Sequence, residues 1–194
     1  MISYLKIAIV GSGPAGFFSA AELLKQTVWC MKVDMFERLP TPFGLVRGGV
    51  APDHQKIKAI QKIFTRTAEN NNFRFFGNVE LGSDIFKNDL LDHYDAIIYA
   101  VGCATDRTLE IPGENLYGSH SATEFVAWYN GHPDYSNHNF DLSSQRALVI
   151  GNGNVALDVA RILVKDPEEL AKTDIADKAL EVLRSSKLED IWLI

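Results

Sequence analysis

Apolar residues along this chain form two kinds of pattern, short continuous runs and sets spaced at helical intervals. Three runs each meet a glycine at their carboxyl end, which is typical of buried parallel strands: 5–10, 95–102 and 147–150. Helically spaced apolar positions follow the first and third runs, beginning at Pro14 and at Asn154. Another strand is expected at 32–37. The chain therefore predicts an α/β fold with parallel sheets.

The order strand, glycine turn, helix and strand occurs twice. The first copy lies at the amino end and the second begins at residue 147. We therefore predict two dinucleotide-binding, Rossmann-like βαβ modules, an FAD-binding domain at 1–106 and the start of an NADP-binding domain at 107–194. The second module is expected to be truncated, because its last strand, 190–194, has no following loop.

The remaining segments are predicted from the same periodicities. Helices are expected at 54–70, 84–91, 122–129, 154–164 and 176–185, and a strand at 73–81. The first of these helices has an apolar side with Ile57, Ile60, Ile63 and Phe64 and a basic side with Lys58, Lys62 and Arg66. A solvated face is the favoured interpretation of the basic side, and docking of an acidic partner is the alternative.

Composition narrows the class of protein. The chain has 194 residues and is 46% hydrophobic, which is typical of a globular protein. Its formal net charge of -6 argues against general binding of nucleic acid or of an anionic membrane. The two cysteines, Cys30 and Cys103, are expected to be buried and reduced, so a cytoplasmic location is expected, or the mitochondrial matrix if a leader has been processed. The five histidines show no zinc-ligand spacing, so no metal is expected. Nothing in the sequence specifies an oligomeric state.

The first glycine loop carries the clearest chemistry. Gly11, Gly13 and Gly16 have the spacing of the dinucleotide fingerprint, and Glu37 ends the next strand, where an acidic residue accepts hydrogen bonds from a ribose. Pro14 suits the first helical position, and the helix N-terminus adds unpaired N–H groups for a pyrophosphate. The loop therefore predicts a dinucleotide site, with packing glycines as the alternative.

The second loop repeats this spacing as Gly151, Gly153 and Ala156. Two such loops indicate two dinucleotides. The residue that separates NAD from NADP should follow the strand at 190–194, so spacing alone does not decide between them. No CxxC motif occurs, so the redox dithiol of the flavin disulfide reductases is absent.

With these motifs the chain resembles the adrenodoxin reductase family, including its bacterial ferredoxin-NADP reductase relatives. The resemblance runs through essentially the whole chain and rests on the segments 9–16, 42–47, 50–54, 77–80, 111–114 and 151–161. Members of that family are much longer, so the chain corresponds to their N-terminal portion only.

The resemblance implies an FAD enzyme that takes a hydride from NADPH and passes single electrons to a small iron-sulfur protein. It implies orienting roles for His54 and Asp158 where flavin and nicotinamide meet. The candidate residues for binding FAD are Gly11, Gly13, Pro14, Ala15, Gly16, Glu37, Arg38, Gly44, Leu45, Val79 and Gly102. Those for binding NADP are Gly151, Asn152, Gly153, Asn154 and Val155.

The sequence is also compatible with two other functions. The chain could be a binding module that holds FAD without turnover, because its flavin and nicotinamide sites are incomplete. It could also be an electron-transfer subunit of the glutamate synthase type, which has paired dinucleotide folds. The segments 42–47 and 51–54, which match the reductase pattern, disfavour this last function, as does the lack of an N-terminal cysteine-rich region.

Overall fold

The computed structural model describes residues 4–103 and 105–194. The chain forms two compact units, Met1–Arg47 with Lys56–Cys103 and Gly48–Gln55 with Ala104–Ile194. The short segment 48–55 thus belongs to the second unit although the first unit flanks it on both sides in the sequence. The sequence alone did not indicate this grouping.

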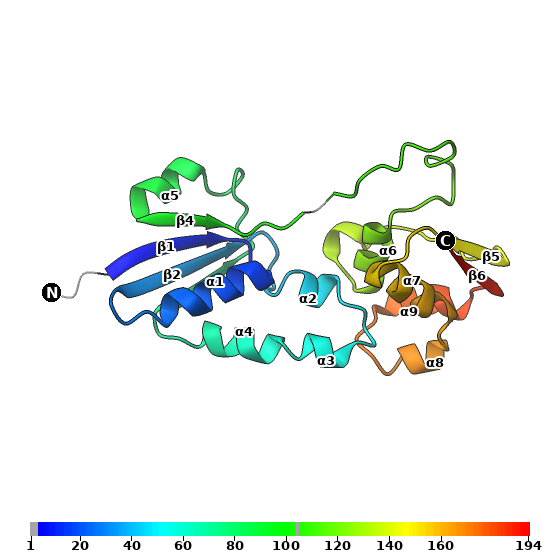
Figure 1. Ribbon diagram of the computed structural model, residues 1–194, viewed down its shortest axis with the longest axis horizontal. Helices are drawn as coiled ribbons and strands as arrows, with labels where there is room; N and C mark the ends of the chain where they lie inside the picture. Colours follow the sequence, from blue (N-terminus) through cyan, green and yellow to red (C-terminus); the bar gives the residue numbers. More distant parts are fainter. Residues whose placement is uncertain (1–3, 104) are drawn as a thin grey trace. The chain divides into compact units, whose positions relative to one another are not determined.

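A parallel sheet forms the centre of the first unit (Figure 1). Its strands have the order β3-β2-β1-β4 and comprise β1 Tyr4–Val10, β2 Cys30–Glu37, β3 Phe73–Gly77 and β4 Ala96–Tyr99. Ile7 of β1 is paired with Val33 of β2 on one side and with Ala96 of β4 on the other. The predicted α/β class with a parallel sheet is therefore confirmed.

Side chains of β1 and β2 point alternately to the two faces of this sheet and are buried on both. Ile9 and Met35 lie in the core under α1, Pro14–Leu24, and α4, Gln61–Ala68. Val10 and Phe36 pack on the opposite face with Leu90 of α5, Lys87–His93. A strand buried on both faces needs the nearly continuous apolar run that the sequence shows.

The second unit repeats the strand, loop and helix arrangement on a smaller sheet. Strands β5, Arg146–Val149, and β6, Asp190–Leu193, pair in parallel. Helix α7, Asn154–Val164, follows the glycine loop, and its buried side packs with α6, Ala122–Tyr129, and α9, Asp177–Arg184. The remaining elements are the one-turn helix α8, Pro167–Leu170, and a 3-10 turn, Pro133–Tyr135. Helices α6 and α7 have the predicted bounds.

The predicted helix at 54–70 is wrong as a single element. It is divided into α3, Gln55–Lys58, and α4, and α2, Leu45–Gly48, precedes it where no helix was expected. At the junction the amides of Ile60 and Lys62 donate to carbonyls three residues earlier, a tighter turn than an α-helix makes. This change of pitch buries Lys58, whereas Lys62 and Arg66 are exposed as predicted.

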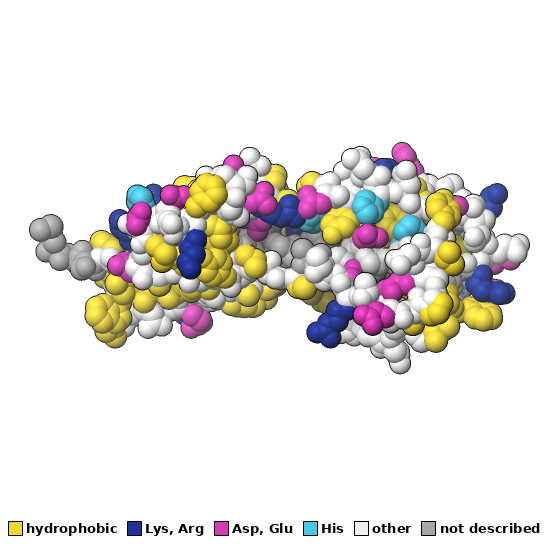
Figure 2. Space-filling view, turned by 90° about the horizontal axis from the view of Figure 1, so that it is seen from above, with side chains coloured by type: hydrophobic (Ala, Val, Ile, Leu, Met, Phe, Trp, Pro, Cys, Tyr) yellow, Lys and Arg dark blue, Asp and Glu magenta, His cyan; other side chains and the backbone are white. Residues whose placement is uncertain are grey.

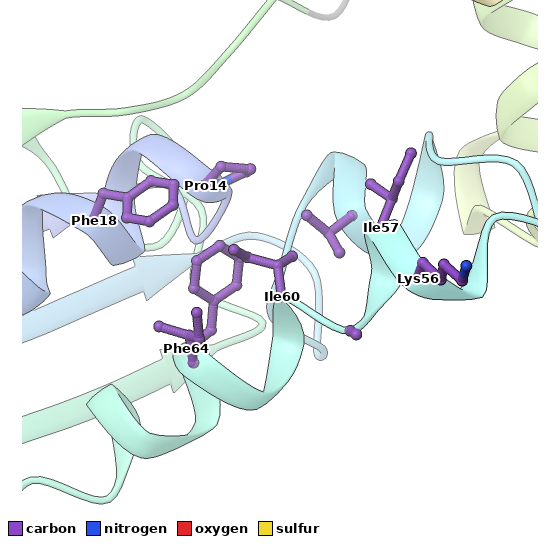
Figure 3. A pocket seen from close by; sticks show the side chains of 9 residues that line it. Pro14, Phe18, Lys56, Ile57, Ile60 and Phe64 are labelled. Carbon is purple, nitrogen blue, oxygen red and sulfur yellow. The ribbon is translucent and has the colours of Figure 1, made fainter.

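The same change of pitch leaves part of the predicted apolar side in contact with solvent. Ile57 is 54% exposed and Ile63 48% exposed. Together with Phe18 of α1 they border a groove of about 620 Å³ (Figure 3). Its lining side chains are apolar except Lys56: Pro14, Phe18, Val46, Ile57, Ala59, Ile60, Ile63 and Phe64.

The expectation of buried cysteines is also wrong. Cys30 begins β2 at the end where the strand leaves the core, and Cys103 follows β4, so both are exposed.

Large apolar side chains on the surface of both units are visible in Figure 2. Val101 after β4 and Ile194 after β6, for example, are both 66% exposed.

Candidate dinucleotide-binding sites

Two glycines of the first loop are required by the fold itself. Gly11 has φ +103°, and a Cβ there would lie 2.3 Å from the carbonyl oxygen of Ala100. A Cβ on Gly16 would lie 2.2 Å from the carbonyl oxygen of Gly11. Real side chains do not approach backbone atoms this closely. These two glycines bring strand β1, helix α1 and the end of β4 into contact.

Gly13 differs, because the fold does not explain it. Its φ of -75° and ψ of -175° are open to any residue, and among the described residues no atom lies within 4 Å of a Cβ built on it. Gly13 is also the N-cap of α1, and in the described structure no side chain caps the helix there. Open space beside uncapped N–H groups is the geometry that an approaching pyrophosphate requires.

Glu37 is fixed at the end of β2 by the same loop. Its Oε2 accepts hydrogen bonds from the Ser12 amide at 3.0 Å and the Ser12 hydroxyl at 2.6 Å, and its Oε1 accepts one from the Leu39 amide at 3.1 Å. Ser12 is fully buried. Oε2 thus accepts two hydrogen bonds and Oε1 only one, so Oε1 keeps a lone pair with which Glu37 can accept from a ribose hydroxyl. Sequence reasoning missed Ser12, whose hydroxyl beside the first glycine was the available signal.

The segment after β2 packs directly on the glycine loop. Phe43 donates its amide to the carbonyl oxygen of Ser12 at 3.0 Å, and a Cβ on Gly44 would lie 2.7 Å from Cα of Gly13. The Val79 amide donates to the carbonyl oxygen of Glu37 at 2.9 Å. The structure thus brings Gly11, Gly13, Glu37, Gly44 and Val79 together at the carboxyl end of the sheet.

The other candidate residues of the first site lie at its surface. Ala15 is exposed on the first turn of α1, Arg38 is exposed beside Glu37, and Leu45 is 69% exposed at the start of α2. Gly102 is exposed after β4 with φ +71°. These positions leave their side chains or backbone open to a ligand.

The second loop reproduces the geometry of the first. Gly151 has φ +129° and donates its amide to the carbonyl oxygen of Ile194 at 2.7 Å. Gly153, with φ -92° and ψ 176°, is the N-cap of α7, and no described atom lies within 4 Å of a Cβ built on it. Asn152, Asn154 and Val155 are exposed around it. The loop therefore has the same uncapped helix end and the same open glycine.

His54 and Asp158, which the sequence analysis singled out, face each other in the second unit. Nδ1 of His54 lies 3.8 Å from Oδ1 of Asp158, and Nη1 of Arg161 lies 2.8 Å from the same oxygen. Arg161 also binds Asp53 through two hydrogen bonds, of 2.8 Å and 2.9 Å, and Lys165 donates to Asp53 at 3.1 Å.

These ionic contacts change the proton affinities of the charged groups. Hydrogen bonding to Arg161 holds the pKa of Asp53 well below its usual range, with Lys165 adding to the effect. Hydrogen bonding to Asp53 raises the pKa of Arg161. Sequence reasoning assigned no role to Asp53, Arg161 or Lys165. The available signal was the spacing of Asp158, Arg161 and Lys165 along one side of α7.

A buried tyrosine lies next to this cluster. Burial raises the pKa of Tyr129, and the nearby charge of Asp158 adds to the effect. Within the described residues, the Tyr129 hydroxyl has no hydrogen-bond partner. The phenol is therefore neutral over the physiological range.

Comparison with known proteins identifies the class that this fold and these loops define. Residues 5–186 match the family model of the pyridine nucleotide-disulphide oxidoreductases. The chain belongs to this family.

Particular relatives are similar over nearly the whole chain. NADPH-ferredoxin reductase FprA of Mycobacterium tuberculosis is 58% identical over 97% of this chain and 42% of its own length. The mitochondrial NADPH:adrenodoxin oxidoreductase of Arabidopsis thaliana is 52% identical over 98% of this chain and 39% of its own length. The solved structure of M. tuberculosis FprA in complex with NADPH superposes with a TM-score of 0.95, at 57% identity, over 98% of this chain and 43% of that one.

The chain therefore spans about two fifths of the length of these relatives. The resemblance to the N-terminal portion of the adrenodoxin reductase family is confirmed. Across residues 4–103 and 105–194, we find no helix with the length and apolar character needed to cross a bilayer.

Proposed function

We propose that this chain carries the two nucleotide-binding loops of an FAD-dependent reductase that moves electrons between NADPH and a small iron-sulfur protein of the ferredoxin or adrenodoxin type. The observation that carries the proposal is the pair of loops around Gly13 and Gly153. Each has an open glycine and an uncapped helix N-terminus, which fits a pyrophosphate. The similarity to NADPH-ferredoxin reductase FprA and to NADPH:adrenodoxin oxidoreductase supports this function.

We assign FAD to the loop at 11–16 and NADP to the loop at 151–155. The domain division proposed with this assignment is 1–106 for FAD and 107–194 for NADP. Glu37 distinguishes the first loop, since its fixed carboxylate is placed to accept hydrogen bonds from the adenosine ribose. Bound FAD would supply the chemistry, because a flavin accepts two electrons as a hydride and releases them singly.

The chain's own residues bind and orient. The N–H groups at the start of α1 and α7 hold phosphates, and the open glycines allow the backbone to approach them. His54 and Asp158 lie close enough for both to contact one polar group of a substrate placed beside them. We propose a positioning role for both, since hydride transfer itself needs no proton at either side chain. Replacing His54 with Gln and measuring flavin reduction by stopped flow tests this role, and an unchanged rate would refute it.

The partner and location follow from the same proposal. A one-electron iron-sulfur protein is the partner whose chemistry matches a flavin that releases electrons singly. We further propose a reducing compartment, the cytoplasm or the mitochondrial matrix, because both cysteines are exposed and a reducing environment keeps such thiols from oxidation.

Two measurements test the proposal. Purified chain is titrated with FAD, followed by flavin fluorescence, and the complex is then mixed with NADPH. We expect quenched flavin fluorescence, followed by bleaching of the visible flavin absorbance and NADPH-dependent reduction of ferricyanide. FAD binding without NADPH-dependent bleaching would support the alternative, a binding module without turnover, and absence of FAD binding would refute the proposal.

A further inference from the structure

Asp53, Asp158, Arg161 and Lys165 form an ionic cluster on one side of α7. The carboxylate of Asp53 is only 7% exposed, and three charged nitrogen atoms of Arg161 and Lys165 bind it. With Asp158 the cluster holds two negative and two positive groups. Its two cations are therefore neutralised within the cluster, which disfavours a role for them in holding phosphate.

The cluster also joins a separate segment of the chain to α7 through Asp53. Asp53 lies in the segment 48–55, which belongs to the second unit although the first unit flanks it. Ala51 and Pro52 in this segment are buried, and the His54 amide donates to the Ala51 carbonyl oxygen at 2.9 Å in a tight turn. The ion pairs of Asp53 thus hold the segment 48–55 on α7 at the residue immediately before His54.

Arg161 contacts Asp158 and also Asp53, the residue that precedes His54. Through Nε and Nη2 it holds Asp53, which is adjacent to His54 in the chain. Through Nη1 it holds the oxygen of Asp158 that faces His54. A planar guanidinium can engage two carboxylates at fixed angles, whereas an ammonium cannot.

We propose that Arg161 is a positioning residue that fixes His54 opposite Asp158, and that Asp53 is its anchor. His54 is thereby held to the nucleotide-binding helix α7 of the second unit. The significance of this arrangement for hydride transfer rests on the function proposed above. The arrangement itself is a property of the chain and can be measured without any cofactor.

The test compares Arg161→Gln, Arg161→Lys and Asp53→Asn with the matched control Arg184→Gln. Arg184 is an arginine of the same unit that binds one carboxylate, Glu168, at 2.9 Å on the surface. Backbone amide exchange is followed by mass spectrometry in the chain without cofactor. Arg161→Gln and Asp53→Asn should speed exchange in 48–55 by about tenfold, while exchange in the strands β1 and β2 stays unchanged. The control should leave 48–55 unchanged.

A spectroscopic readout separates positioning from mere stability. The ring signals of His54 are recorded by NMR at one fixed pH, where every variant is folded. We expect them to move in Arg161→Gln, to move less in Arg161→Lys, and to stay in place in Arg184→Gln. Ring signals and exchange in Arg161→Gln that match the parent chain would overturn the proposal. If Arg161→Gln does not fold, the same two readouts of Asp53→Asn decide.

The reduction rate of bound FAD by NADPH then tests the functional consequence. If Arg161 acts through His54, Arg161→Gln should slow reduction about tenfold in the parent chain and have no further effect in the His54→Gln background. Full additivity of the two changes would contradict the proposal. Failure of the parent chain to bind FAD would instead refute the proposed function, and the exchange and NMR results would stand apart from it.

Discussion

The substitution Gly13→Ala separates binding from folding more cleanly than any other change in the first loop. Since Gly13 has an ordinary backbone conformation and open space at its Cβ, alanine should leave the fold intact and can even stabilise it by about 0.5 kcal/mol through the unfolded state. The new methyl group stands where the pyrophosphate must approach. Losing two charge-assisted hydrogen bonds to phosphate costs roughly 3 kcal/mol, equivalent to about a hundredfold weaker FAD binding.

The assay for this prediction is a fluorescence titration of the chain with FAD, paired with urea unfolding. Gly153→Ala is the matched control, because Gly153 has the same open geometry in the other loop. We expect Gly13→Ala to weaken FAD binding and spare NADP binding, and Gly153→Ala to do the reverse, with both variants as stable as the parent. Unaltered FAD affinity in Gly13→Ala, or its unfolding, would refute the reasoning.

Four further substitutions test the packing and ionic interactions. Gly16→Ala should destabilise the chain by about 3 kcal/mol in urea, since its Cβ would meet a backbone oxygen at 2.2 Å. Because the pKa of Asp53 is lower in the folded chain than in the unfolded one, its stabilisation is complete above about pH 4 and is lost only as the pH falls on toward the lowered pKa of the folded chain. Asp53→Asn should therefore cost about 2 kcal/mol at pH 7 and progressively less as the pH is lowered below about 4. Tyr129→Phe, which removes a buried hydroxyl without a partner among the described residues, should change the free energy of unfolding by less than about 1 kcal/mol. Asp34→Ala should cost about 2 kcal/mol in the same assay, because the buried Asp34 accepts a hydrogen bond from the Tyr94 hydroxyl at 2.6 Å. A loss of stability below about 0.5 kcal/mol in Asp34→Ala or in Gly16→Ala would contradict the assigned contacts.

The parts of the fold that the sequence predicted well are those that local chemistry determines. Helix α7 follows a glycine turn and has a clear apolar side, and its predicted and observed bounds agree. Gly13 and Gly153 each stand at the start of a helix, where the glycine spacing placed them. These features depend on neighbouring residues, so a single sequence contains their signal.

The errors arise where distant contacts decide the outcome. Helical periodicity placed Lys58 on a solvated side, but a change of pitch near Ile60 turns it into the interior. The link between Asp53 and Arg161 joins residues 108 positions apart, and no spacing rule anticipates such a pair. The exposure of Cys30 likewise depends on how far β2 extends past the core.

The assignment of FAD to the first loop and NADP to the second is tested most directly by amide chemical shifts of the isotope-labelled chain. FAD should move the amide signals of residues 11–16 and leave those of 151–155 in place. Subsequent addition of NADP should move the signals of 151–155. Signals of 151–155 that respond to FAD while those of 11–16 stay unchanged would contradict the account.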